Sequence, residues 1–132
     1  GSTKTECGIH VDGAEKTWDR DLWEEGAVIA LESNDAALEV TKNGASSVMV
    51  VYAPWCQFCQ KMEDDLSAFA ADSDIAVYKF RGDEEREFAS ANLNTESFPT
   101  VNVINADGTV VKYESEDRSP EAIKKFVADT IA

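Results

Sequence analysis

The motif Cys56-Gln57-Phe58-Cys59 is the feature that most restricts what this chain can fold into. It closely follows Val48-Met49-Val50-Val51-Tyr52, a β-branched run without polar alternation that predicts a strand buried on both faces. After the motif, apolar residues recur at helical spacing over Met62–Phe69. The two cysteines therefore lie where a buried strand ends and a helix begins, an arrangement typical of a parallel α/β sheet.

This position predicts different roles for the two thiols. Cys56 would lie at the helix N-terminus, where unpaired N–H groups and the helix dipole favour a thiolate, so its pKa should lie below the ~8.5 of a free cysteine. Cys59 would lie one turn inside, with a higher pKa, close enough to attack a mixed disulfide on Cys56. The alternative is an inert buried pair or a static disulfide. A polar helix start and a loop at 53–55 that we expect to be exposed disfavour it.

Length, composition and charge exclude several classes. A chain of 132 residues, 43% hydrophobic and 29% charged, is typical of one globular domain rather than a disordered chain or coiled coil. A net charge of −14 disfavours nucleic-acid and membrane-surface partners. The longest apolar run, 48–53, is too short to span a membrane, so we expect a soluble protein. No leader pattern opens the chain, so we expect a mature protein or an excised piece.

The remaining segments predict an α/β domain over 27–132, preceded by a polar acidic arm, 1–26, that Trp18 and Trp23 dock onto it. Strand–helix alternation predicts a parallel core, to which a closing hairpin adds antiparallel strands. The expected elements are a strand at 28–31, a helix capped by Asn34 or Asp35 and ended by Gly44, a strand at 75–80, a helix capped by Asp83, strands at 100–105 and 110–113 around Asp107-Gly108, and a helix opened by Ser119-Pro120.

The odd cysteine count indicates a redox pair plus one further thiol, Cys7. A zinc site from Cys7, His10, Cys56 and Cys59 is the other reading, but the spacing matches no common zinc motif. We therefore expect no metal.

The segment Val51-Tyr52-Ala53-Pro54-Trp55-Cys56, with Cys59 and the later Phe98-Pro99-Thr100, resembles the thioredoxin superfamily over residues 28–131. The resemblance implies a thioredoxin fold, with a central mixed sheet flanked by helices. It also implies a cis Phe98–Pro99 bond beside the cysteines. Trp55, Phe98 and Pro99 would then form a substrate groove in which backbone groups of Phe98 pair with the substrate.

A narrower similarity is to the C-terminal redox domain of plant and algal adenylyl-sulfate (APS) reductases. It rests on Ala53–Gln60, Lys79-Phe80-Arg81, Ser97–Thr100 and Lys112-Tyr113. Glu6-Cys7-Gly8-Ile9-His10 resembles the end of the reductase domain that precedes it in those enzymes, so Cys7 would match the thiol that takes the sulfonate.

This resemblance implies a glutathione-dependent thiol–disulfide oxidoreductase in the plastid. It would deliver electrons to a reductase domain that makes sulfite in sulfate assimilation. Its partners would be glutathione or a protein disulfide and that reductase domain. No cofactor is expected in this chain, since an iron–sulfur cluster would belong to the reductase domain that the chain lacks.

Two departures bear on the reductant. Val50 stands where thioredoxins and protein disulfide isomerases carry a buried carboxylate that helps deprotonate the resolving thiol. Resolution by Cys59 would then use water or another group, which fits a glutaredoxin-like cycle finished by glutathione. Against this, Pro54 and Trp55 stand where glutaredoxins commonly hold a glutathione-binding lysine.

The local charge leaves the same question open. Anionic glutathione would need positive charge gathered by Lys61, Arg81 or Lys112 in this acidic chain. The alternatives are a general thioredoxin or a protein-disulfide-isomerase-like oxidoreductase, and a binding module whose cysteines are only structural.

Overall fold

The structure is a computed structural model that describes residues 7–8, 22–23, 26–54, 56–115 and 117–131. The elements in chain order are β1 (Cys7–Gly8), β2 (Val28–Leu31), α1 (Asn34–Val40), β3 (Ser47–Tyr52), α2 (Gln57–Lys61), α3 (Glu63–Asp72), β4 (Ala76–Arg81), the 3-10 helix η2 (Gly82–Glu84), α4 (Arg86–Asn92), β5 (Ser97–Phe98), β6 (Thr100–Ile104), β7 (Val110–Tyr113) and α5 (Pro120–Ile131).

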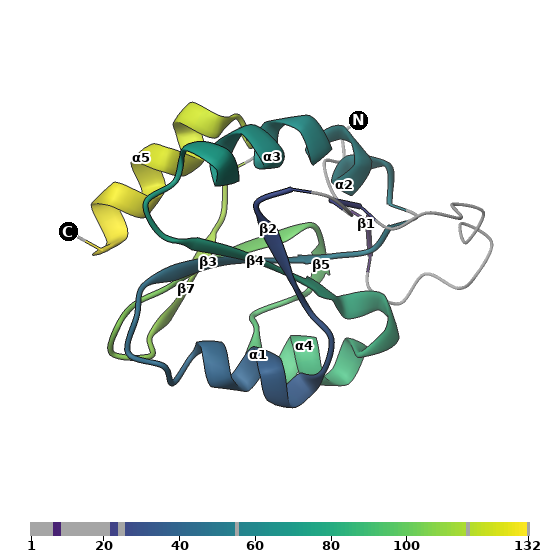
Figure 1. Ribbon diagram of the computed structural model, residues 1–132. Coiled ribbons are helices and arrows are strands. Elements are labelled where there is room, and N and C mark those ends of the chain that lie inside the picture. The colour runs from purple at the N-terminus through teal and green to yellow at the C-terminus, as the bar shows by residue number, and fades with distance from the viewer. Residues whose placement is uncertain (1–6, 9–21, 24–25, 55, 116, 132) are drawn as a thin grey trace.

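A five-stranded mixed sheet in the order β2-β4-β3-β6-β7 forms the centre of the fold. β3 pairs in parallel with β4 and antiparallel with β6, and β7 pairs antiparallel with β6. Figure 1 shows α1 and α4 on one face of the sheet and α3 and α5 on the other. A separate two-stranded pair joins β1 to β5. The expected mixed sheet flanked by helices, the thioredoxin fold, is confirmed.

The buried strand β3 and the β6–β7 hairpin form as the sequence predicts. All six residues of β3 are buried, as a β-branched run covered on both faces requires. β6 and β7 form the predicted antiparallel hairpin. Its turn is closed by a hydrogen bond from Asn105 N to Thr109 O of 2.9 Å, and Gly108 adopts a φ of +91° that favours glycine.

Three helix boundaries differ from the prediction. The hydroxyl of Ser33 caps α1 by accepting from Ala36 N, and the helix ends at Val40, so neither Asn34 nor Asp35 is the cap. Asp83 caps no α-helix but lies in η2, and Glu85 precedes α4. The helix after the cysteines is interrupted at Met62, which ends α2 and begins α3.

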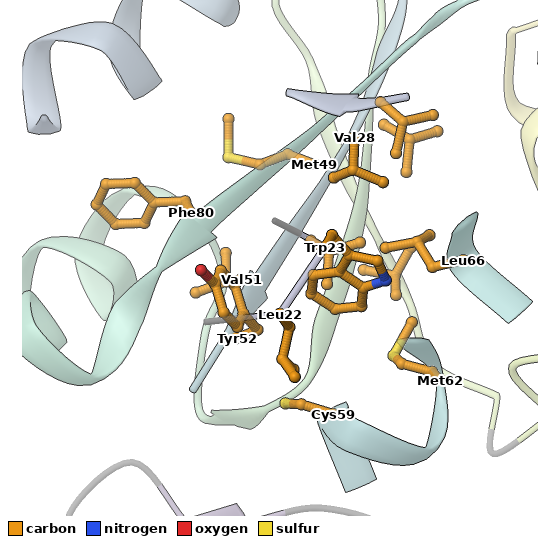
Figure 2. Close-up of a cluster of buried hydrophobic side chains, with 14 of the residues drawn as sticks. Leu22, Trp23, Val28, Met49, Val51, Tyr52, Cys59, Met62, Leu66 and Phe80 are labelled. Carbon is orange, nitrogen blue, oxygen red and sulfur yellow. The ribbon is translucent and has the colours of Figure 1, made fainter. Parts of the chain in front are cut away.

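The end of the arm belongs to the hydrophobic core. Leu22 and Trp23 are 0% and 3% exposed, which confirms that Trp23 docks onto the domain. Figure 2 shows both in a cluster with Met62 and Cys59. Trp18 and His10 lie outside the described residues. Within the described chain, no helix has the length and apolar character needed to cross a membrane.

Candidate redox site

The two cysteines lie where β3 gives way to α2, as predicted. Cys56 is the N-cap of α2, and its amide donates to Ala53 O at 3.0 Å, which turns the chain from the strand into the helix. The side-chain amide of Gln60 donates to Pro54 O at 2.9 Å and fixes the loop from the other side.

The two sulfurs are in different states. Cys56 is disulfide-bonded, whereas Cys59 is a free, buried thiol, so they are not bonded to each other. The sulfur of Cys56 lies 3.6 Å from Phe98 O. A disulfide sulfur has no proton to donate, so this is a close contact that brings the carbonyl of β5 against the first cysteine.

The expected exposure of the loop at 53–55 is wrong for the part that is described. Ala53 and Cys56 are 0% exposed and Pro54 is buried. The tight turn between Ala53 and Cys56 and the contact with Phe98 account for this burial. Trp55, predicted to line the groove, lies outside the described residues.

Burial raises the pKa of Cys59 to about 12, in the predicted direction. A hydrogen bond with the backbone of Ala53 and the charge of Arg118 oppose the shift, and the charge of Asp83 adds to it. A thiol in these surroundings remains protonated at neutral pH. That the pKa of Cys56 is lowered stays a prediction.

A second loop lies against Cys56. The Phe98–Pro99 bond is cis, as the resemblance implies. Phe98 is fully buried, and Thr100 Oγ1 donates to Ser97 O at 2.7 Å across the turn. A Cβ at Gly82 would lie 2.5 Å from Val51 Cγ1 and 2.8 Å from Phe98 Cε1, so only glycine lets η2 approach β3 and Phe98 this closely.

The partner of β5 is the chain's own N-terminal segment. β1 pairs with it antiparallel, with Cys7 opposite Phe98 and Gly8 opposite Ser97. The structure thus brings together predicted site residues that lie 42 or more positions apart in the sequence. They are Cys56, Phe98 and, through its backbone, Cys7.

Sequence reasoning missed Asp83 as a residue of this site. Its side chain is fully buried and accepts from Arg81 Nε at 2.8 Å and Nη2 at 3.3 Å. The signal lay in the topology, since Tyr52 and Arg81 end the parallel strands β3 and β4, and parallel strands end at the same edge of a sheet.

The cations proposed to attract glutathione lie on three different elements of the fold. Arg81 is paired with Asp83 and Glu84, and Lys112 lies in β7, opposite Asn102. Only Lys61 is in α2, with its Nζ 5.4 Å from the ring centroid of Phe58. Among the described residues, no group of three or more His, Cys, Asp or Glu side chains could hold a metal ion.

Comparisons with known proteins show which family the chain belongs to. Residues 27–129 match the Thioredoxin family. The chain is 33% identical to 5'-adenylylsulfate reductase 1, chloroplastic, of Arabidopsis thaliana, over 92% of this chain and 30% of that protein. It is 32% identical to protein disulfide isomerase-like 1-1 of the same plant, over 67% of this chain and 18% of that protein.

Solved structures agree with this assignment at the level of the fold. A mutant thioredoxin from Halobacterium salinarum superposes with a TM-score of 0.68 and 24% identity, over 82% of this chain and 96% of that one. The chain spans less than a third of the length of the three adenylylsulfate reductases that it matches. The chain has a Cys-x-x-Cys motif at a helix start, and the Thioredoxin family match covers most of its length. The chain therefore belongs to the thioredoxin family of thiol–disulfide oxidoreductases.

Proposed function

We propose that this chain is the electron-delivering redox domain of an adenylyl-sulfate reductase, with the end of the reductase domain still attached as β1. The observation that carries the proposal is the pairing of β1 with β5, which sets the backbone of Cys7 opposite Phe98 while Phe98 O contacts Cys56. A domain that serves Cys7 must bring these two cysteines together.

The extent of the sequence match supports this assignment. Similarity to the Arabidopsis reductase covers 92% of the chain, more than the family match at 27–129, so it includes part of the arm. That relative and its rice counterpart are named as chloroplastic, which supports a plastid location. An iron–sulfur cluster would belong to the reductase domain, and nucleic acid and membranes are not proposed as partners.

The chemistry is a sequence of thiol exchanges. The Cys56 thiolate attacks the sulfur of a sulfonated Cys7, the bond from that sulfur to the sulfonate breaks, and sulfite leaves with the electron pair. The product is a Cys7–Cys56 disulfide. A second thiolate then attacks Cys56 and releases Cys7 as a thiolate. Two glutathione molecules supply the electrons overall and become one glutathione disulfide.

The second thiolate comes from glutathione or from Cys59. A Cys59 pKa of about 12 leaves very little thiolate at neutral pH, and the neighbouring Val50 side chain offers no base. These two features favour glutathione as the thiol that finishes the cycle. Trp55, Phe98 and Pro99 would form the groove in which it or the Cys7 strand binds.

Reduction of a peptide–glutathione mixed disulfide by this chain tests the thiol roles. Cys56→Ser should abolish the activity. Cys59→Ser should retain at least about half of it if glutathione finishes the cycle, and lose it if Cys59 does. Cys7→Ser serves as the matched control and should not reduce it, because Cys7 is the recipient of electrons and not their source.

The full-length enzyme tests the link to sulfite. Cys7→Ser there should stop sulfite release while leaving reduction of the peptide mixed disulfide intact. Sulfite production at the normal rate by that variant would separate this chain from APS reduction but leave its family assignment unchanged.

A general protein disulfide isomerase or thioredoxin function is the second candidate, favoured by the 32% identity to the isomerase-like protein. The redox potential separates the two. A value of about −270 to −200 mV supports a reductant, and one near about −180 mV supports an isomerase.

A further inference from the structure

Leu22 and Trp23 hold the arm to the domain through several buried contacts. The amide of Trp23 donates to Glu63 Oε2 at 2.9 Å, and its indole Nε1 donates to Glu63 O at 2.9 Å. Its ring meets the ring of Tyr52 edge-on, with centroids 5.2 Å apart. Figure 2 shows the Trp23 ring lying among the core side chains. Trp23 also has a φ of +54°, which a bulky residue adopts only where its surroundings hold it there.

Lys79 adds a contact from the sheet itself. It is 5% exposed, lies in β4 opposite Val50, and its Nζ donates to Leu22 O. The same Nζ lies 5.7 Å from the ring centroid of Tyr52. An ammonium group taken out of water requires such partners, so a carbonyl of the arm completes the surroundings of a buried charge.

The distance along the chain between this anchor and β1 is short. Thirteen residues, 9–21, separate Gly8 from Leu22. Even fully extended, such a segment spans at most about 45 Å. Fixing one end of it in the core therefore confines β1 to a small volume near β5, which corresponds to an effective concentration in the millimolar range.

We propose that Leu22 and Trp23, held by Glu63 and Lys79, form an anchor that makes the Cys7 segment a tethered substrate. The anchor shortens the tether and so raises the effective concentration of Cys7 at Cys56, and an external disulfide must first displace β1 from β5. This inference rests on the proposed function, in which Cys7 is the redox partner of Cys56.

The state of the sulfurs supports the tether. Cys56 is in a disulfide that does not involve Cys59, as a cycle in which Cys56 first exchanges with the tethered Cys7 requires. In the proposed cycle a glutathione thiolate attacks Cys56, the Cys7–Cys56 bond breaks and a Cys56–glutathione bond forms. Cys7 leaves with the electron pair and takes up a proton from water, and a second glutathione then attacks the glutathione sulfur, which releases Cys56 and forms glutathione disulfide.

The experiment uses the whole chain carrying Cys59→Ser, so that Cys56 can bond only to Cys7 or to glutathione. The protein is equilibrated in a buffer of reduced and oxidised glutathione at about 1 mM, near the expected effective concentration. It is then quenched with acid, alkylated and mapped by mass spectrometry. The ratio of Cys7–Cys56 disulfide to Cys56–glutathione disulfide gives the effective concentration of Cys7.

Lys79→Met, which keeps the apolar stem, and Trp23→Phe, which keeps a ring, should each lower this ratio by up to about twofold, because release of the anchor lengthens the tether from residues 9–21 to residues 9–27 and the effective concentration falls as about the −3/2 power of tether length. Each should also raise kcat/KM toward an external peptide–glutathione mixed disulfide. Lys124→Met is the matched control, because Lys124 is an exposed lysine on α5 paired with Asp72, and it should change neither quantity.

The ratio separates anchoring from general stability, since both disulfides form in the same folded domain. An unchanged ratio in Lys79→Met and Trp23→Phe overturns the anchor, even where the melting temperature falls. If Trp23→Phe does not fold, Lys79→Met decides. Absence of any Cys7–Cys56 disulfide in the parent protein instead overturns the proposed function on which the anchor rests.

Discussion

Burial of the Cys59 thiol connects the redox site with the stability of the fold. Cys59 is fully buried in the cluster that contains Leu22 and Met62, and this removal from water raises its pKa to about 12. In the unfolded chain the same thiol titrates at about 8.5. The native state therefore retains a proton at alkaline pH that the unfolded state has lost.

The sign of the pH dependence follows from this difference. Because the pKa is higher in the folded state, the contribution of Cys59 to the free energy of unfolding is fully present below about pH 8.5 and is lost as pH rises towards 12. The loss should amount to at most about 1.4 kcal/mol per pH unit in that window. Urea unfolding at pH 7 and pH 10.5 measures it, with Cys7→Ser and Cys56→Ser in the background to prevent disulfide exchange.

Adding Cys59→Ala to that background provides the control, because it removes the thiol without adding a charge. The stability difference between the two proteins should shrink or reverse from pH 7 to pH 10.5. A difference that stays constant over this range would mean that the thiol is not held protonated by the fold.

At the scale of elements, the β6–β7 hairpin depends on a glycine for two separate reasons. Gly108 has a φ of +91°, and a Cβ there would also lie 2.9 Å from Thr41 O. Gly44 has a similar φ of +78° but open space around it. The two positions therefore separate the cost of the backbone conformation from the cost of a clash.

Gly44→Ala should lower the free energy of unfolding by about 1–2 kcal/mol, the cost of a left-handed backbone for a residue with a Cβ. Gly108→Ala should cost about 1–3 kcal/mol more, because the turn and the end of α1 must also move apart. Chemical denaturation of both variants measures the difference. Equal costs would show that the hairpin can shift away from Thr41 freely.

The elements that could be predicted from sequence are those whose signals are local. A continuous β-branched run predicted β3, and Asp107-Gly108 between two apolar runs predicted the hairpin. The cap of α1 was misplaced by one or two residues because Ser33, Asn34 and Asp35 are all good cap residues. Only the side-chain geometry selects Ser33.

The parts of the site that could not be predicted depend on contacts between distant segments. Asp83 reads as a helix cap in sequence, but the close approach of Gly82 to Phe98 turns the chain into η2 and buries the carboxylate beside Arg81. The pairing of β1 with β5 involves only two residues on each side, too few for any periodic signal.

At the scale of the whole molecule, the arm and the domain share one core. The family match begins at residue 27, yet Leu22 and Trp23 are buried in the same cluster as β3 and α3. Large apolar side chains at such positions contribute several kcal/mol to stability. We therefore expect the independently stable unit to begin before Leu22, ahead of the segment that the family match covers.

Two truncations test where that unit begins. In reducing buffer, where no disulfide contributes, a protein starting at residue 9 loses β1 but keeps Leu22 and Trp23, and its free energy of unfolding should fall by less than about 1 kcal/mol, since β1 pairs only two residues with β5. A protein starting at residue 27 loses both side chains and the carbonyl that Lys79 contacts. Its free energy of unfolding should fall by about 4 kcal/mol or more.

Urea titration of both proteins measures these changes in the free energy of unfolding. If the shorter protein does not fold, Trp23→Ala in the full chain measures the contribution of the buried Trp23 side chain instead. Equal midpoints for the two truncations would show that Leu22 and Trp23 cover the core without stabilising it, and that the domain is complete from residue 27.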